Sequence, residues 1–329
     1  MPKLFAALEA PKPDAADGMS LSACPIPGVH GHRVAKDVQG EPLVLVSTAG
    51  AHERLPAPVR LENIAIDHGV HCKIWQGEKL VEEGIFTVLK CLSRDASLRD
   101  HFLSVGGPFL LCLGDRPSPS QVAAFLDTLV QLFRALTEPP RKSVQGMWAE
   151  LFLIASARDA RAMMRAWHPT PDERYDFSAG SQRLEVKSAV GRPRRHHFSL
   201  EQLAPPLMTT VLIASVCTER AGGGASLGDL IAQLRSRLTR DADLLLRLDA
   251  VVAATLGRSL LQALDEAYDL ELAKESLSFF EVAAVPRPPG AMPREVSNVR
   301  FVADLSNVEP VELALYTGAE GLFEAALPQ

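Results

Sequence analysis

Two acidic residues and a lysine are spaced so that a β-hairpin would bring them together. Asp176 is followed after eight intervening residues by Glu185, and Lys187 comes two residues later. If residues 179–182 form the turn, Asp176 lies opposite Glu185, and Lys187 shares their face. Facing carboxylates repel, and a divalent cation between them removes that cost. The spacing therefore favours a metal-dependent hydrolytic site in which Lys187 orients water or stabilises an oxyanion. A solvated sheet face with a weak ion pair is the alternative.

A third acid lies on the helix expected before this hairpin. Ser143 can cap a helix that runs to about Trp167, and Glu150 falls within its apolar stripe. Because an unpaired charge is costly to bury, Glu150 needs a partner. A metal ion at the hairpin is one candidate, and Arg158 or another basic residue is the other.

A basic segment follows the hairpin directly. From Lys187 to His197 the chain holds four Lys or Arg residues, two histidines and no acid. Such a segment beside a metal site suits the phosphate backbone of a nucleic acid. The predicted contacts are Arg192, Arg194, Arg195 and His196, and His197 is a supporting residue at the site. A solvated basic loop is the alternative.

Pattern and composition divide the chain into four parts. A loosely ordered lead-in is expected over 1–40, because residues 11–40 are rich in Pro, Gly, Asp and His. An N-terminal α+β domain is expected over 41–140, ending at Pro139 and Pro140. The hairpin belongs to a core over 141–220, and 221–329 is a helical extension whose late strands complete that core. The periodicity predicts strands at 42–47, 61–67, 71–75, 109–113, 174–178, 183–189, 209–218, 279–285 and 299–305, and helices at 87–103, 120–136, 143–167, 227–238 and 244–267.

Composition excludes several classes of protein. The 329 residues are 47% hydrophobic and carry a net charge of -6, which excludes a wholly disordered chain and a globally basic coat for nucleic acid. No apolar run approaches the roughly 20 residues that span a bilayer, and no secretion signal is evident. The five cysteines lack metal-finger spacing, and they indicate buried thiols in a reducing cytoplasm.

The acid–acid–lysine hairpin preceded by a helical Glu resembles the PD-(D/E)XK nuclease superfamily. The wider stretch from Gly146 to Leu203 is similar to a bacterial PD-(D/E)XK group that tends to be encoded in restriction or anti-phage loci. The matching residues are Gly146, Met147, Trp148, Glu150, Trp167, His168, Tyr175, Asp176, Phe177, Leu184, Glu185, Val186, Lys187, Ser188 and the run from His197 to Leu203. One departure is Tyr175, where the motif has Pro. The rival pair Pro171-Asp172 is less favoured, because Asp172 would lie beyond the paired part of the hairpin.

The resemblance implies an α+β fold with a restriction-endonuclease-like core, a central mixed sheet flanked by helices, over 141–220. It implies that Asp176, Glu185, the Val186 carbonyl and Glu150 bind Mg²⁺, for which Mn²⁺ could substitute. Lys187 would activate water, and Gln202 would support the site. The implied activity is that of a cytoplasmic DNA endonuclease in restriction or anti-phage defence. Other defence-complex subunits are further candidate partners, no membrane is involved, and a homodimer would suit double-strand cutting. The alternative function is an inactive subunit that binds nucleic acid or a defence-complex partner.

Overall fold

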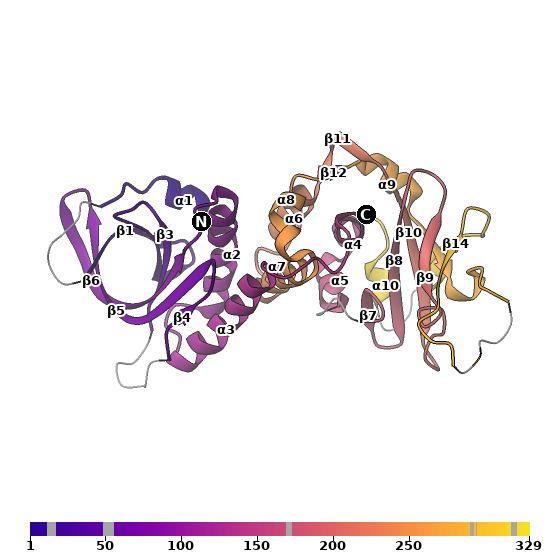
Figure 1. The fold of residues 1–329 in the computed structure, drawn as a ribbon, viewed down its shortest axis with the longest axis horizontal. Helices are drawn as coiled ribbons and strands as arrows, with labels where there is room; N and C mark the ends of the chain where they lie inside the picture. The colour runs from indigo at the N-terminus through magenta and orange to yellow at the C-terminus, as the bar shows by residue number, and fades with distance from the viewer. Residues whose placement is uncertain (12–17, 49–55, 169–172, 290–292, 294, 317–320) are drawn as a thin grey trace. The chain divides into compact units, whose positions relative to one another are not determined.

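The computed structural model describes residues 1–11, 18–48, 56–168, 173–289, 293, 295–316 and 321–329 (Figure 1). The chain forms two compact units, Met1–Thr137 and Glu138–Gln329. The division falls between Thr137 and Glu138, next to Pro139 and Pro140. Among the described residues, no helix has the length and apolar character needed to cross a bilayer.

The sheet of the first unit closes on itself. Its strands run in the order β1-β2-β3-β6-β5-β4, and β1 also pairs with β5 in parallel, so that five strands form a closed barrel. The other neighbours are antiparallel. Inward side chains such as Leu21, Leu43 and Ile74 fill the interior. The strands are β1 Met19–Ile26, β2 Val29–Asp37, β3 Pro42–Val46, β4 Val59–Arg60, β5 Ile64–Gln76 and β6 Lys79–Cys91, and the helices are α1 Pro2–Ala6, α2 Ala96–Leu113 and α3 Pro119–Ala135.

Three sequence predictions for this unit are wrong. Residues 19–37, expected within a loose lead-in, form β1 and β2. The first part of the helix expected at 87–103 instead ends β6, and α2 begins only after Asp95, whose side chain caps it. The strand expected at 109–113 is the end of α2, because the helix continues through Gly106, Gly107 and Pro108. Gly106 has a packing role there, since an added Cβ would lie 2.6 Å from the Met1 side chain.

The second unit is built on a mixed four-stranded sheet in the order β13-β10-β8-β7. Strands β8 and β10 are parallel, and the outer strands pair antiparallel with them. The predicted apolar strand at 209–218 is confirmed as β10, in which every residue after Thr210 is buried. Two small sheets, β11-β12 and β14-β9, flank it. The strands are β7 Phe177–Ala179, β8 Gln182–Val190, β9 Arg195–Ser199, β10 Thr210–Thr218, β11 Arg220–Ser226, β12 Ala267–Tyr268, β13 Ser278–Glu281 and β14 Arg300–Asp304.

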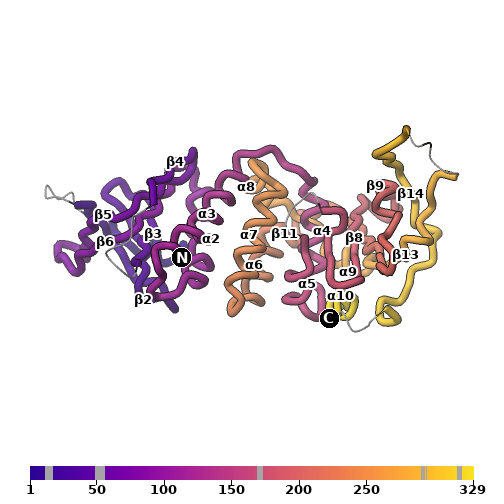
Figure 2. Tube along the Cα trace, turned by 90° about the horizontal axis from the view of Figure 1, so that it is seen from below, coloured from indigo at the N-terminus to yellow at the C-terminus, as the bar shows by residue number. Residues whose placement is uncertain are grey.

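Helix α4 lies alongside β8 in both views (Figures 1 and 2). Ser143 caps it as predicted, by accepting a hydrogen bond from the Gly146 N–H. The single helix expected over 143–167 is broken at Ala157, whose backbone is extended, and Asp159 caps a second helix. The confirmed fold class is α+β, with helices flanking sheets. The helices are α4 Val144–Ser156, α5 Ala160–Ala166, α6 Leu227–Arg237, α7 Ala242–Leu256, α8 Leu260–Ala263, α9 Leu270–Ser276 and α10 Leu322–Ala325, with short 3₁₀ turns η1 Gly257–Ser259, η2 Val282–Ala284 and η3 Leu313–Tyr316.

Candidate functional site

The β7–β8 hairpin has the register expected from the sequence. Phe177 pairs with Leu184 and Ser178 with Arg183, although the turn is tighter than expected because Ala179 also pairs with Gln182. Asp176 lies one position before β7, and its Oδ2 accepts a hydrogen bond of 2.8 Å from the Val186 N–H. This bond fixes the Asp176 carboxylate against β8 beside Glu185. The rival Asp172 lies outside the described residues.

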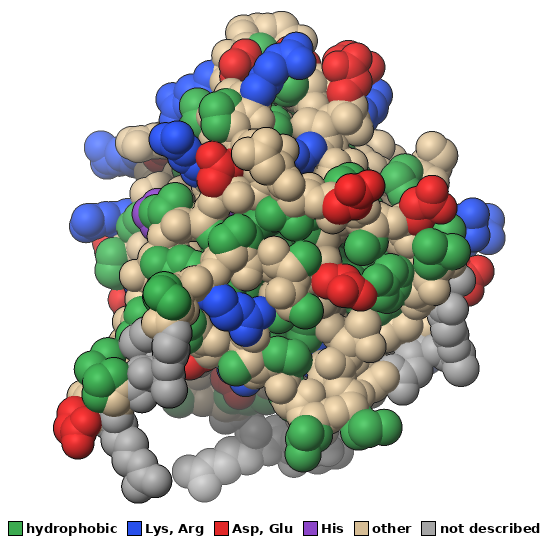
Figure 3. Space-filling model, turned by 90° about the vertical axis from the view of Figure 1, so that its right-hand side faces the viewer, with side chains coloured by type: hydrophobic (Ala, Val, Ile, Leu, Met, Phe, Trp, Pro, Cys, Tyr) green, Lys and Arg blue, Asp and Glu red, His purple; other side chains and the backbone are tan. Residues whose placement is uncertain are grey.

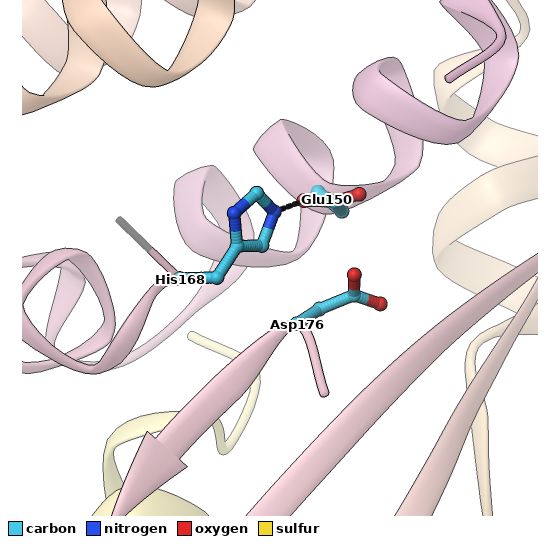
Figure 4. Close-up of side chains that lie close together, drawn as sticks. All are labelled: Glu150, His168 and Asp176. Atoms are coloured by element: carbon cyan, nitrogen blue, oxygen red, sulfur yellow. Dashed lines mark hydrogen bonds and ion pairs between the residues drawn. The ribbon is translucent and has the colours of Figure 1, made fainter. Parts of the chain in front are cut away.

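Helix α4 delivers Glu150 to the same place. Its carboxylate is 3% exposed and accepts a 2.7 Å hydrogen bond from Trp167 Nε1. His168 Nε2 lies 3.0 Å from the same Glu150 oxygen. The backbone N–H of His168 donates to the backbone carbonyl of Asp176 at 2.8 Å. Glu150, His168 and Asp176 point toward one another (Figure 4). Each offers a ligand atom within 4.8 Å of the others.

Lys142 holds two of these acids together. Its Nζ lies 2.8 Å from Glu150 Oε1 and 2.6 Å from Asp176 Oδ1, and it is 3.3 Å from His168 Nε2. Of the two partners considered for Glu150, a basic residue is therefore the one observed, but it is not Arg158, which pairs with Glu324.

Glu185, Lys187 and Gln202 form an adjoining group. Lys187 Nζ lies 2.8 Å from Glu185 Oε1, which also accepts a 2.6 Å hydrogen bond from Gln202 Nε2. Lys187 in turn donates to Gln202 Oε1 at 3.2 Å, and the Ser199 N–H donates to that oxygen as well. Lys187 also lies 5.3 Å above the Phe198 ring. Gln202 thus orients both the acid and the lysine of β8.

Burial and neighbouring charges perturb the titration of these groups. Burial, and then repulsion by Asp176, raises the pKa of Glu185 to about 7. Burial and the Glu150 charge raise the pKa of Asp176 above its ordinary value. Burial also opposes ionisation of Glu150, but the His168 hydrogen bond and the Lys142 charge hold its pKa below the ordinary value. Burial would lower the pKa of Lys142, yet Asp176 and Glu150 outweigh it and raise that pKa. The site therefore concentrates negative charge that any added cation would stabilise.

The basic segment is divided between the interior and the surface. The predicted phosphate contacts Arg194 and His196 are wrong, because both side chains bind inside the protein. Arg194 donates to the Ser215 carbonyl and hydroxyl and to Ser278 Oγ, and His196, 1% exposed, lies 2.8 Å from Ser215 Oγ. This burial lowers the pKa of His196 to about 4, so that its ring is neutral near pH 7.

The other residues predicted to act in that segment are exposed. Arg192 is exposed, as is Arg195, which pairs with Asp304. His197 is also exposed and alternates along β9 with the buried Phe198, so it faces away from the ring beneath Lys187. The structure therefore does not bring His197 into the site. The face drawn in Figure 3 mixes basic with acidic and apolar side chains, and basic ones lie at the upper left, near the centre and at the right edge.

The donor set fits a small divalent cation. Carboxylate oxygens are the ligands that Mg²⁺ prefers, and opposite ligands of an octahedral Mg²⁺ lie about 4.2 Å apart. The Glu150, His168 and Asp176 atoms, within 4.8 Å of one another, are close to that spacing. The two carboxylates would suit Mn²⁺ as well as Mg²⁺, whereas the imidazole nitrogen is a ligand more typical of Zn²⁺ or Fe²⁺. Glu185 would have to turn from Lys187 and Gln202 to share the ion with Asp176, and the inner-shell role of the Val186 carbonyl stays a prediction.

Lys142, Trp167 and His168 are the site residues whose contacts with the acids the sequence did not predict. The resemblance includes Trp167 and His168 but implies no role for them. Lys142 follows the Pro139-Pro140 break, and no motif surrounds it. The one available signal was the need of buried Glu150 for hydrogen-bond donors.

One family model matches the chain. It carries the description "Putative PD-(D/E)XK family member" (DUF4420) and covers residues 1–306, which include both units up to the end of β14. No curated protein and no solved structure matches the chain. Since the model covers most of the sequence, including the hairpin, the α4 acid and Gln202, the chain belongs to the PD-(D/E)XK-like family DUF4420.

Proposed function

We propose that this protein is a metal-dependent phosphodiester hydrolase whose substrate is DNA. The observation that carries the proposal is the convergence of Asp176, directly before β7, on Glu185 of the paired strand β8, with Lys187 2.8 Å from Glu185. Two carboxylates and an ammonium in one buried cluster can hold a cation, orient water and stabilise charge on a phosphate.

Each residue has a distinct part in this chemistry. A bound Mg²⁺ or Mn²⁺ would polarise the phosphoryl oxygen and stabilise the leaving oxygen. Asp176, Glu185 and Glu150 would hold it, and the Val186 carbonyl would complete the set. Lys187 would orient the attacking water through its ammonium, because Gln202 already fixes that ammonium beside Glu185. Arg192 and Arg195, on the surface after β8, would contact the phosphate backbone.

The resemblance drawn from the sequence extends the proposal to a biological setting. The enzyme would act in the cytoplasm of a bacterium in restriction or anti-phage defence. It would work as a homodimer or with other subunits of a defence complex.

Lys142 supports a second candidate function. Because its ammonium already pairs with both Glu150 and Asp176, the cluster is balanced in part without a metal. A subunit that uses this fold to bind nucleic acid or a partner, without cutting, would need no metal ion to balance these carboxylates.

DNA cleavage separates the two functions. We expect supercoiled plasmid to be nicked or cut with Mg²⁺ or Mn²⁺ and left intact with EDTA. Lys187→Ala and Glu185→Gln should abolish cutting, whereas Lys274→Ala, on exposed α9, should cut at the parental rate. Matching circular dichroism spectra would show that the variants fold. Cutting by Lys187→Ala at the parental rate would refute the assigned chemistry, and no cutting by the parent with intact DNA binding would favour the second function.

A further inference from the structure

Lys142 contacts the same three side chains that could bind a cation. Glu150 and Asp176 each turn one oxygen toward its Nζ, at 2.8 and 2.6 Å, and His168 Nε2 is 3.3 Å away. Glu150, His168 and Asp176 are also the residues that form the compact donor group of the described chain. An ammonium and a metal ion repel each other and need the same space, so they cannot share this position.

The charges of the cluster also indicate that Lys142 and a divalent cation would replace each other. Glu150, Asp176 and Glu185 carry three carboxylates, and Lys142 and Lys187 carry two ammonium groups. The balance with all five ionised is -1, and it becomes -2 when the Lys142 ammonium leaves. A divalent cation then balances this net charge of the three carboxylates and Lys187.

The side chain of Lys142 can leave without a change in the backbone. The neighbouring Arg141 N–H donates to the Thr255 carbonyl at 2.8 Å, and Ser143 caps α4, so the chain is held on both sides. The Lys142 side chain is 27% exposed, whereas those of Glu150 and Asp176 are 3% and 8% exposed. The flexible four-carbon stem therefore connects the buried cluster to solvent.

We propose that Lys142 is an internal competitor for the divalent cation: its ammonium takes the cation position when no metal is bound, and metal binding expels it toward solvent. This inference rests on the proposed function, since it assumes a metal site at Asp176 and Glu150. Its consequence is that the parent protein binds metal more weakly than its carboxylates alone would allow.

Chemical labelling of the parent protein tests the expulsion directly. Reductive methylation followed by peptide mass spectrometry reports how accessible each lysine amine is. Lys142 should react slowly without metal and several-fold faster with saturating Mn²⁺, while exposed Lys274 reacts at one rate in both conditions. An unchanged Lys142 rate at saturating Mn²⁺ would overturn the proposal.

Metal affinity of variants tests the competition. Calorimetry should show that Lys142→Met binds Mn²⁺ about 5- to 150-fold more tightly than the parent, the usual range for coupled sites. Lys142→Gln, which keeps a polar head, should show the same direction, and Lys274→Met should bind like the parent. Equal or weaker binding by both Lys142 variants would overturn the proposal. If Lys142→Met does not fold, Lys142→Gln and the labelling of the parent decide the question.

The two proposals fail in different ways. If neither the parent nor a folded Lys142 variant binds Mn²⁺, the metal site itself is absent and the proposed function falls. If the parent binds Mn²⁺ while removal of the Lys142 ammonium brings no gain in affinity, the competition is refuted and the metal site stands.

Discussion

Protonation of His196 gives a quantitative test of how the segment after β8 is used. The sequence favours this histidine as a phosphate contact, whereas the structure buries it against Ser215 and lowers its pKa from 6.5 to about 4. His196 is therefore protonated below about pH 6.5 in the unfolded chain but only below about pH 4 in the folded protein. The stability that comes from keeping His196 neutral is present above pH 6.5 and is lost as the pH falls toward 4.

The size of the effect follows from these two pKa values. The interval from 6.5 to about 4 is worth about 3 kcal/mol once both titrations are complete. At pH 5, where the unfolded chain is protonated and the folded protein is not, the loss relative to pH 8 is about 2 kcal/mol. Other groups also respond to acid, so the measured quantity is the difference between the parent and a variant.

The assay is urea unfolding at pH 8 and pH 5 for the parent, His196→Gln and His197→Gln. We expect the parent to lose about 2 kcal/mol more than His196→Gln between these pH values. His197→Gln, which changes the exposed neighbour, should behave like the parent. An equal pH response of the parent and His196→Gln would refute the buried neutral ring.

Three further predictions concern Arg194 and Arg192 of the basic segment and Glu185 of the acid cluster. Arg194→Met should destabilise the protein by about 3 kcal/mol, because it removes a charged hydrogen-bond donor from Ser215 and Ser278. Arg192→Ala should leave the stability unchanged and weaken DNA binding. Urea unfolding measures the stability of both variants, and a salt titration measures their DNA binding. An equal loss of stability in the two variants would contradict the buried role of Arg194 and the surface role of Arg192. Mn²⁺ affinity should fall about tenfold per pH unit below 7, because burial and Asp176 raise the pKa of Glu185 to about 7 and the metal needs the carboxylate. Calorimetry from pH 5.5 to 8 measures this dependence, and a flat profile would contradict it.

Local patterns predicted the hairpin because its pairing depends on neighbouring residues. The alternation of Leu184 and Glu185 fixes which side chains share a face, and the short turn at Gly180 sets the register with Phe177. The parallel partner β10 was equally plain from its continuous apolar run. By contrast, the prediction of a strand at 109–113 was wrong. The sequence from Gly106 to Pro108 is typical of a break in a helix, and only the packing of α2 shows that the helix continues.

The barrel of the first unit could not be predicted from local composition. Residues 19–22 of β1 pair with residues 72–75 of β5, about fifty positions later, and that parallel pairing closes the sheet. The Pro and Gly content of 11–40 is typical of loops, yet Pro25 is accommodated at an irregularity of the β1–β2 ladder. Composition describes a segment, whereas the pairing depends on the rest of the unit.

The acid cluster shows the same limit at the level of chemistry. Burial of Glu150 could be predicted from its helical stripe, and burial requires donors, but the sequence does not say which donors arrive. The structure supplies three from two segments: Lys142 before α4, and Trp167 and His168 after α5. Trp167 and His168 could stay in place around a metal ion, whereas the Lys142 ammonium could not. On the proposed competition, the metal affinity of this protein would therefore depend less on its three acids, which the hairpin and α4 hold in place, than on whether the Lys142 side chain can be moved.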